Sequence, residues 1–240
     1  MEPKTALVTG ANHGLGFALT SGLLEQGWRV FAGRYDARWS QLEELQKRFP
    51  DTLHLVSLDV ADSELVSAAA REVAALSSSL DLLLSNAAVF TETSYPTIRH
   101  AQNYDEMLRL YNVNTLGALR VVEAFLPLLD AGEMKRLCFV SSEAGSLTRA
   151  HRGSWFGYCQ SKAALNMAAR LLFNDLRPQG FSFRLYHPGS IRSYMHGAKN
   201  QSADLEPEEA AIPALNYFLN LLDDEDRLVM RDERGQEWPW

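Results

Sequence analysis

Short apolar runs alternate with longer amphipathic segments from one end of the chain to the other. The runs are rich in Val, Leu, Phe and Ala, which is typical of strands covered on both faces of a parallel sheet. They predict strands at residues 5–9, 29–33, 53–58, 82–85, 136–141, 181–186 and 227–230. Helical spacing of apolar residues between them predicts helices near 15–26, 38–48, 62–78, 104–130, 155–177 and 207–223.

This alternation indicates a parallel sheet, because each helix carries the chain back over the sheet to begin the next strand. We therefore predict an α/β fold: a single doubly wound Rossmann domain over residues 1–240, with a seven-stranded parallel sheet flanked by helices. Two long polar connections, 89–103 and 189–206, follow predicted strands. In such folds the ligand lies among the loops at the carboxyl ends of the strands.

Composition narrows the class of protein. The 46% apolar and 22% charged residues are ordinary for a globular protein, and 240 residues suit one α/β domain. The net charge of −7 disfavours nucleic acid and anionic lipid, and the N-terminal apolar run is too short for a signal peptide or membrane anchor. Cys138 and Cys159 form neither a disulfide framework nor a CxxC metal pair. We expect a soluble, cytoplasmic protein without a metal.

A glycine-rich turn follows the first predicted strand. Residues 9–16 read Thr-Gly-Ala-Asn-His-Gly-Leu-Gly, and a helical pattern begins directly after them. A pyrophosphate can approach the N-terminus of a helix closely only where glycines replace side chains. The turn therefore predicts a dinucleotide site. The alternative is an ordinary strand-to-helix turn that happens to be rich in glycine.

The end of the second predicted strand indicates which dinucleotide binds. NAD-binding folds carry an acidic residue there for the adenosine ribose, whereas this strand ends at Gly33-Arg34. An arginine can pair with a 2′-phosphate, so Arg34 favours NADP(H), with NAD(H) as the second choice. His13 in the glycine turn could add a donor to the same phosphate. The alternative is that Arg34 is a solvated surface residue.

A tyrosine and a lysine in the segment 155–177 are candidates for proton transfer. Tyr158 and Lys162 are four residues apart, so they share one helix face. A free phenol has a pKa of about 10, and a nearby ammonium would stabilise its charged form. A serine at the end of the fifth predicted strand, Ser141 or Ser142, could hold a substrate oxygen. The alternative is a structural tyrosine beside a solvated lysine.

Taken in order, these features resemble the short-chain dehydrogenase/reductase family along essentially the whole chain. Within it they resemble the branch of small carbonyl reductases of the C-factor and sniffer type, through the run Tyr-x-x-Ser-Lys-Ala-Ala-Leu-Asn and the final Trp-Pro-Trp. The matching motifs are the turn 9–16, Asp59-Val60, Ser85-Asn86-Ala87-Ala88, Asn114, Ser142, Tyr158 with Lys162, and Pro-Gly-Ser-Ile-Arg-Ser at 188–193.

The resemblance implies a role for each catalytic residue. Tyr158 would be the general acid in reduction and the general base in oxidation, and Lys162 would lower its pKa and bind the nicotinamide ribose. Ser142 would orient and polarise the carbonyl, and Asn114 would hold a water linking Lys162 to solvent. The implied activity is NADP-dependent reduction of an aldehyde or ketone to an alcohol, or the reverse, on a small-molecule substrate.

The same resemblance implies a cofactor site along the carboxyl ends of the strands. Its glycines would pack on the pyrophosphate, Asp59 and Val60 would contact adenine, Asn86 would support the ribose region and Ile191 would meet the carboxamide. The residues expected at the cofactor are Gly10, Asn12, His13, Gly14, Leu15, Gly16, Arg34, Asp59, Val60, Asn86, Ala87, Tyr158, Lys162, Pro188, Gly189, Ile191 and Ser193.

Some positions depart from the family pattern. Ser85 and Ala88 replace an asparagine and a glycine, and Ser193 stands where a threonine is usual. Ser142 and Tyr158 are 16 residues apart, more than is common, which predicts an enlarged loop at the substrate mouth. These departures leave open an alternative function, a nucleotide-binding regulatory or scaffold protein without turnover. An isomerase or dehydratase using the same tyrosine is a third reading.

Substrate and assembly are less constrained. Aromatic residues near the crevice loops favour an apolar or aromatic substrate, although such residues also anchor loops. They are Phe90, Trp155, Phe156 and Tyr194, with Met195 beside them. Relatives often associate through the helices at 104–130 and 155–177, which implies a homodimer or homotetramer. Exposed Trp238 and Trp240 would be unusual, so we expect them to be covered by a partner or folded back.

Overall fold

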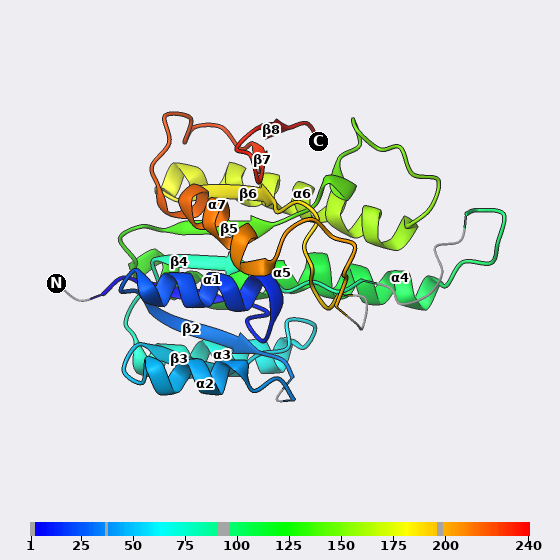
Figure 1. The fold of residues 1–240 in the computed structure, drawn as a ribbon. Helices are drawn as coiled ribbons and strands as arrows, with labels where there is room; N and C mark the ends of the chain where they lie inside the picture. Colours follow the sequence, from blue (N-terminus) through cyan, green and yellow to red (C-terminus); the bar gives the residue numbers. More distant parts are fainter. Residues whose placement is uncertain (1–2, 37, 91–96, 196–198) are drawn as a thin grey trace.

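One sheet runs through the protein, and the computed structural model describes residues 3–36, 38–90, 97–195 and 199–240. Its strand order is β3-β2-β1-β4-β5-β6-β7-β8 (Figure 1). All neighbouring pairs are parallel except β7 and β8. From β1 the chain adds β2 and β3 on one side and then β4, β5 and β6 on the other, which confirms the doubly wound α/β fold. The strands are β1 (Thr5–Val8), β2 (Arg29–Arg34), β3 (Leu53–Ser57), β4 (Leu82–Ser85), β5 (Arg136–Val140), β6 (Ser182–His187), β7 (Met230–Asp232) and β8 (Glu237–Trp238).

Helices cover both faces of this sheet, each over its own apolar core (Figure 1). On one face lie α1 (Gly14–Glu25), α2 (Gln41–Arg48) and α7 (Pro207–Leu219). On the other lie α3 (Ser63–Leu76), α5 (Gly117–Ala131) and α6 (Phe156–Leu176), with α4 (Tyr104–Tyr111) packed on α6.

Strand β1 shows why the apolar runs are unbroken. Ala6 and Val8 belong to the core under α1 and α7, and Leu7 belongs to the core under α3, α5 and α6. Successive side chains of a strand point to opposite faces, so a strand covered on both sides needs apolar residues at every position.

The helix predicted at 104–130 is interrupted by a π-helical segment. Residues Asn112–Leu116 separate α4 from α5, and Asn114 lies within this segment. Such wide turns inside a helix are rare and frequently mark functional sites. The apolar periodicity continues across the segment, so the sequence pattern did not predict it.

The strand predicted at 227–230 was wrong in position, and β8 was not predicted. Arg227 lies in a turn whose backbone N–H donates to the Asp224 carbonyl, and the strand begins only at Met230, opposite Leu185 of β6. A hairpin with a positive φ at Gly235 then returns the chain as β8, which raises the sheet to eight strands in the described residues. Pairing with β6 decides this register, and local sequence cannot show it.

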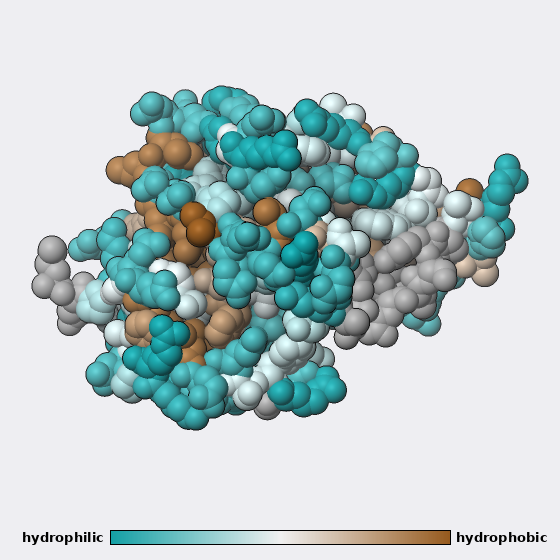
Figure 2. Space-filling model, viewed as in Figure 1, coloured by the Kyte–Doolittle hydropathy of each residue, from teal (hydrophilic) through white to brown (hydrophobic). Residues whose placement is uncertain are grey.

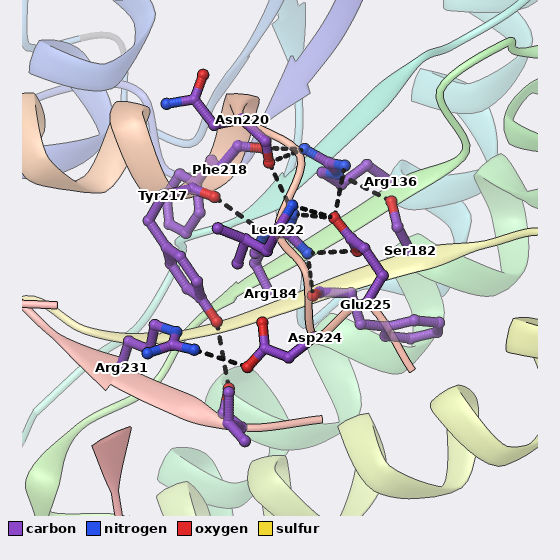
Figure 3. A network of polar contacts seen from close by, with 12 residues as sticks. Arg136, Ser182, Arg184, Tyr217, Phe218, Asn220, Leu222, Asp224, Glu225 and Arg231 are labelled. Atoms are coloured by element: carbon purple, nitrogen blue, oxygen red, sulfur yellow. Dashed lines mark hydrogen bonds and ion pairs between the residues drawn. The ribbon is translucent and has the colours of Figure 1, made fainter. Parts of the chain in front are cut away.

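A buried polar network holds the end of α7 to the sheet (Figure 3). Arg136 of β5 donates to the carbonyls of Phe218 and Asn220 at 2.8 and 3.1 Å, and Arg184 of β6 donates to the Asn220 carbonyl at 2.8 Å. Glu225 pairs with both guanidinium groups, at 3.4 Å from Arg136 and 2.5 Å from Arg184. These cations meet the helix end whose carbonyls carry partial negative charge.

The surface seen from the side of α1 and α7 has two different regions. Hydrophobic residues gather over the half that holds these helices, whereas hydrophilic residues dominate near the carboxyl ends of the strands (Figure 2). Ile212 of α7 and Leu221, which follows α7, are 65% and 84% exposed. In the described part of the chain, no helix is both long enough and apolar enough to cross a membrane.

Candidate active site

The glycine turn forms a cradle at the start of α1. Gly10 and Gly14 have φ values of +63° and +59°, which residues with a Cβ rarely adopt. A Cβ on Gly16 would overlap the Gly10 carbonyl. His13, at the N-cap of α1, makes no side-chain hydrogen bond to the first turn. The backbone N–H groups of this turn are therefore available to an anion, as a dinucleotide pyrophosphate requires.

The end of β4 fixes the shape of this cradle. Asn86 Nδ2 donates to the carbonyls of Thr9 and Gly10 at 3.0 and 3.1 Å. Thr9 Oγ1 in turn accepts the backbone N–H groups of Asn86 and Ala87, both at 3.0 Å. Asn86 thus supports the nucleotide loop through the backbone, and Ser85, the departure from the family pattern, is a buried strand residue beside it.

At the end of β2, the predicted phosphate-binding arginine is already paired. Arg34 lies 2.6 Å from Glu43 of α2, and both side chains are about one-third exposed. Asn12 shapes the same corner, because its Oδ1 accepts the Tyr35 N–H at 2.8 Å and its Nδ2 donates to the Asp36 carbonyl at 2.6 Å. Glu43 was missed by the sequence analysis, and its place on α2 opposite the strand end gives no local signal.

An aromatic cluster joins the glycine turn to the loop after β6. The His13 ring lies 4.4 Å from Trp39 and 5.7 Å from Tyr194, and Trp39 and Tyr194 are 4.8 Å apart. Burial lowers the pKa of His13, which favours its neutral form, and Asp36 opposes this shift. A Cβ added to Gly14 would lie 3.7 Å from the Cβ of Ser193, which places these two residues at the same junction.

Tyr158, Ser142 and Lys162 meet at the carboxyl end of β5. The Lys162 Nζ lies 5.9 Å from the centre of the Tyr158 ring and donates to the Val140 carbonyl at 3.0 Å. Tyr158 shares a hydrogen bond with Ser142. Ser141 points elsewhere, because its Oγ donates to Asn166 Oδ1 at 2.6 Å in the interior. The structure therefore distinguishes the two serines that the sequence left equal.

Burial dominates the protonation of this pair. It raises the pKa of Tyr158 to about 12, although the hydrogen bond with Ser142 acts in the opposite direction. Burial also lowers the pKa of Lys162 to about 8. Desolvation is the largest influence on the phenol, and the lowering of the pKa of Tyr158 by Lys162 stays a prediction. The phenol is protonated at neutral pH, as a proton donor must be.

Asn114 makes its hydrogen bonds to residues that support Tyr158 and Lys162, and not to these two side chains themselves. Its Oδ1 accepts the Val89 N–H at 2.8 Å, and its Nδ2 donates to the Val89 carbonyl and to Ser161 Oγ, both at 3.0 Å. The π-helical segment thereby ties the chain after β4 to the helix that carries Tyr158 and Lys162. Asn114 is 2% exposed, so these hydrogen bonds are made in the interior of the protein.

Apolar side chains surround the phenol ring. Phe90 packs edge-on against Tyr158 at 4.6 Å, and Trp155 packs against Phe90 at 5.0 Å. Leu110 and Ala144 complete this cluster. Trp155 has a φ of +66°, an unusual conformation for a residue with a side chain, directly at the start of α6. The phenol is 9% exposed, with apolar side chains around its ring, while the ion pair of Glu143 and Arg152 lies near enough to influence its pKa.

The remaining predicted cofactor residues lie along the same edge of the sheet. Asp59 accepts the Ala61 N–H at 2.9 Å, whereas the side chain of Val60 is buried in the core next to Gly117. A direct adenine contact by Val60 would therefore involve its backbone. The others are placed in the turn of α1, in the chain after β4 or in the chain after β6: Leu15, Ala87, Pro188, Gly189, Ile191 and Ser193.

These residues fit a dinucleotide. The positive φ values at Gly10 and Gly14 and the crowded Gly16 leave a backbone cradle at a helix N-terminus. The His13 Nδ1, on the residue that precedes α1, is buried without a hydrogen-bond partner in the described residues. The glycine turn, Arg34 and Tyr158 all lie at the carboxyl edge of one sheet, where doubly wound folds bind such groups.

Comparison with known proteins gives a consistent picture. Residues 4–204 match the family described as short chain dehydrogenase. The chain is 34% identical to an uncharacterised oxidoreductase of Schizosaccharomyces pombe, over 85% of this chain and 81% of the relative. It is 38% identical to the C-signal protein of Myxococcus xanthus, over 58% and 81%. The NADPH-bound carbonyl reductase from chicken fatty liver has a TM-score of 0.86 at 28% identity and covers 100% of both chains.

Proposed function

This chain belongs to the short-chain dehydrogenase family of oxidoreductases, and we propose that it reduces an aldehyde or ketone to an alcohol, or catalyses the reverse, with NADP(H). The observation that carries the proposal is the meeting of Tyr158, Ser142 and Lys162 beside the glycine cradle. The likeness to the NADPH-bound carbonyl reductase supports it.

Each residue has a defined task in this proposal. When bound, NADPH supplies the hydride. Tyr158, whose pKa is raised to about 12, donates the proton to the carbonyl oxygen, and Ser142 holds that oxygen by a hydrogen bond. Lys162 is held by the Val140 carbonyl, where its ammonium can bind a ribose hydroxyl and favour the phenolate left after proton transfer.

Turnover of a carbonyl panel with NADPH tests this proposal. We expect oxidation of NADPH with at least one apolar aldehyde or ketone, because Phe90 and Trp155 shield the phenol. Tyr158→Phe should lower kcat by about 10²–10⁴, the usual contribution of a positioned acid, with NADPH binding retained. Wild-type turnover that is unchanged by Tyr158→Phe would overturn the assignment of this residue.

For the cofactor, we propose that Arg34 receives the 2′-phosphate. Arg34 is bound to Glu43 through one nitrogen, Nη1, at 2.6 Å. Arg34→Asp should therefore weaken NADPH binding by about 10- to 100-fold and leave NADH binding less affected, because a charge-assisted pair is lost and a like charge is added. Equal losses for both cofactors would show that Arg34 only supports the strand end.

A nucleotide-binding regulatory protein without turnover is the second candidate. Two observations favour it: Tyr158 is only 9% exposed beneath Phe90, and a relative over more than half of this chain bears the name C-signal. Tight binding of NADPH by calorimetry, with no hydride transfer to any carbonyl and no effect of Tyr158→Phe, would support this candidate over the reductase.

We also propose that the chain forms a homodimer or homotetramer through α4 and α6. Leu108 of α4 and Leu171 of α6 are 66% and 60% exposed on two helices that pack against each other, so both side chains are free to join an apolar contact with a second copy. Light scattering should give at least twice the monomer mass, and Leu171→Glu should reduce it. The free Cys138 and Cys159 suit the cytoplasmic location that we expect.

A further inference from the structure

A long loop joins two of the proposed catalytic residues. Residues 143–155, which we call the mouth loop, connect Ser142 to the helix that carries Tyr158. The first turn of the loop is held by α6, because Asn166 Nδ2 donates to the Gly145 carbonyl at 3.1 Å. Beyond this turn the residues 147–151 are all exposed, so α6 does not cover the middle of the loop.

The middle of the mouth loop is held instead by Trp238, Pro239 and Trp240, which we call the tryptophan segment. Ser146 Oγ donates to the Pro239 carbonyl, and Thr148 Oγ1 donates to the Trp240 carbonyl at 3.3 Å. The Arg149 guanidinium lies 4.3 Å from the centre of the Trp238 ring, within the range of a cation–π interaction.

The other side of the tryptophan segment is attached to the body of the protein. Trp238 and Trp240 pack against the core under α3, α5 and α6. Arg170 of α6 lies 5.2 Å from the Trp240 ring, and His187, which ends β6, lies 5.2 Å from the Trp238 ring. The two tryptophans are therefore folded back on the chain, which was one of the two arrangements expected for them; the other was coverage by a partner.

From these contacts we propose that the tryptophan segment is a positioning element that holds the mouth loop in one conformation beside Ser142 and Tyr158. An exposed loop with few buried contacts opens easily, and several weak contacts to a rigid neighbour shift its population toward the closed form. The kinetic part of this inference rests on the proposed function. The structural part, a loop held by the segment, does not.

Limited trypsin digestion tests the structural part, because the mouth loop carries two cleavage sites, Arg149 and Arg152. Trp238→Ala should increase the rate of cleavage at these sites by about tenfold. This corresponds to a loss of about 1.4 kcal/mol in the free energy that favours the closed conformation of the loop. Trp238→Phe keeps an aromatic ring under Arg149 and should restore most of the protection. Cleavage after Arg71, on the surface of α3, reports general unfolding and should stay unchanged.

Steady-state kinetics tests the functional part on the same variants. Trp238→Ala should raise KM for the carbonyl by about three- to tenfold with a smaller change in kcat, because the loop borders the substrate entrance and not the hydride path. The Kd for NADPH should stay within about twofold, and Trp238→Phe should recover KM. A role in folding alone would change the yield of active protein and leave KM unchanged.

Arg149→Met provides a second variant in case Trp238→Ala fails to fold. It removes one contact to the segment, and Arg71→Met is its matched control. Faster cleavage at Arg152 in the first variant alone supports the proposal, whereas equal rates in both overturn it. Should wild-type protein show no turnover, the reductase assignment fails while the digestion result still decides whether the segment holds the loop.

Discussion

Strand β5 has buried cations near both ends, two arginines at one and a single lysine at the other, and they differ in how fully their charges are paired. At the amino end, Arg136 and Arg184 are 1% and 2% exposed and donate to helix carbonyls and to Glu225 (Figure 3). At the carboxyl end, Lys162 is equally buried, but within the described residues its one hydrogen-bond acceptor is the Val140 carbonyl.

This difference separates a structural charge from a chemical one. A buried guanidinium with several acceptors and a carboxylate holds one packing arrangement and keeps its proton. A buried ammonium with a single neutral acceptor has a pKa lowered to about 8, close enough to neutral pH for its charge to respond to a ligand. Incomplete pairing, more than burial itself, distinguishes the candidate active site from the network under α7.

Replacing a cation at each end of β5 by methionine should show the largest difference, because only the change at Lys162 should lower activity. Lys162→Met should lower kcat/KM by about 10²–10⁴ while the protein stays folded, because methionine fills the space without the desolvation penalty. Arg184→Met is the matched control and should leave kcat of the folded fraction near that of wild type. Turnover of Lys162→Met within about threefold of wild type would contradict this division of roles.

Removing the carboxylate should affect stability alone. Glu225→Gln leaves Arg136 and Arg184 without their counter-charge, so we expect a loss of about 3 kcal/mol in the free energy of unfolding. The low end of the usual range applies because the Glu225 side chain is 26% exposed. Urea denaturation measures the loss, and a change below about 1 kcal/mol would show that water replaces the missing charge.

The free energy of unfolding should depend on pH through Lys162, at the carboxyl end of β5. Lys162 has a folded pKa of about 8 against an unfolded value of about 10.4, so the unfolded chain binds more protons between these values. Stability from this group therefore rises from pH 8 to pH 10.4, by on the order of 1–3 kcal/mol. The difference in unfolding free energy between wild type and Lys162→Met isolates it, and a flat difference would contradict it.

The smallest effect should come from a peripheral partner of the arginine cluster. Ser182 Oγ accepts from Arg136 Nε at 2.8 Å, while the other nitrogens of Arg136 keep their own acceptors. Ser182→Ala should cost only about 0.5–1.5 kcal/mol in urea denaturation. A loss as large as that of Glu225→Gln would show that the network acts as a single cooperative unit.

Local pattern predicted most of the fold. The strands from β1 to β6 are largely buried, apart from the edge strand β3, and their predicted apolar runs lie within a residue of the observed bounds. Glycine spacing in the turn 9–16 and the interval between Tyr158 and Lys162 are also local features, because one turn or one helix face sets them. These parts could be predicted because the physics that decides them acts between residues close in the chain.

Other features depend on partners far away in the chain. Asn166 engages Ser141 and leaves Ser142 for Tyr158, and Glu43 pairs with Arg34 from the next helix. The π-helical segment contains Asn114, which is attached to Val89 and Ser161. Arg34 and Glu43 are nine residues apart, but the other pairs are separated by 25 residues or more, so no local window of the sequence contains both of their members.

The amino-acid sequence by itself determined the alternation of strands and helices, the glycine cradle and the shared helix face of Tyr158 and Lys162. Only the tertiary structure decided which buried charges are fully paired, and where the tryptophan segment lies. The reason is that hydrophobic periodicity and backbone freedom are properties of neighbouring residues. Desolvation and hydrogen-bond satisfaction depend on the complete set of groups that folding brings together.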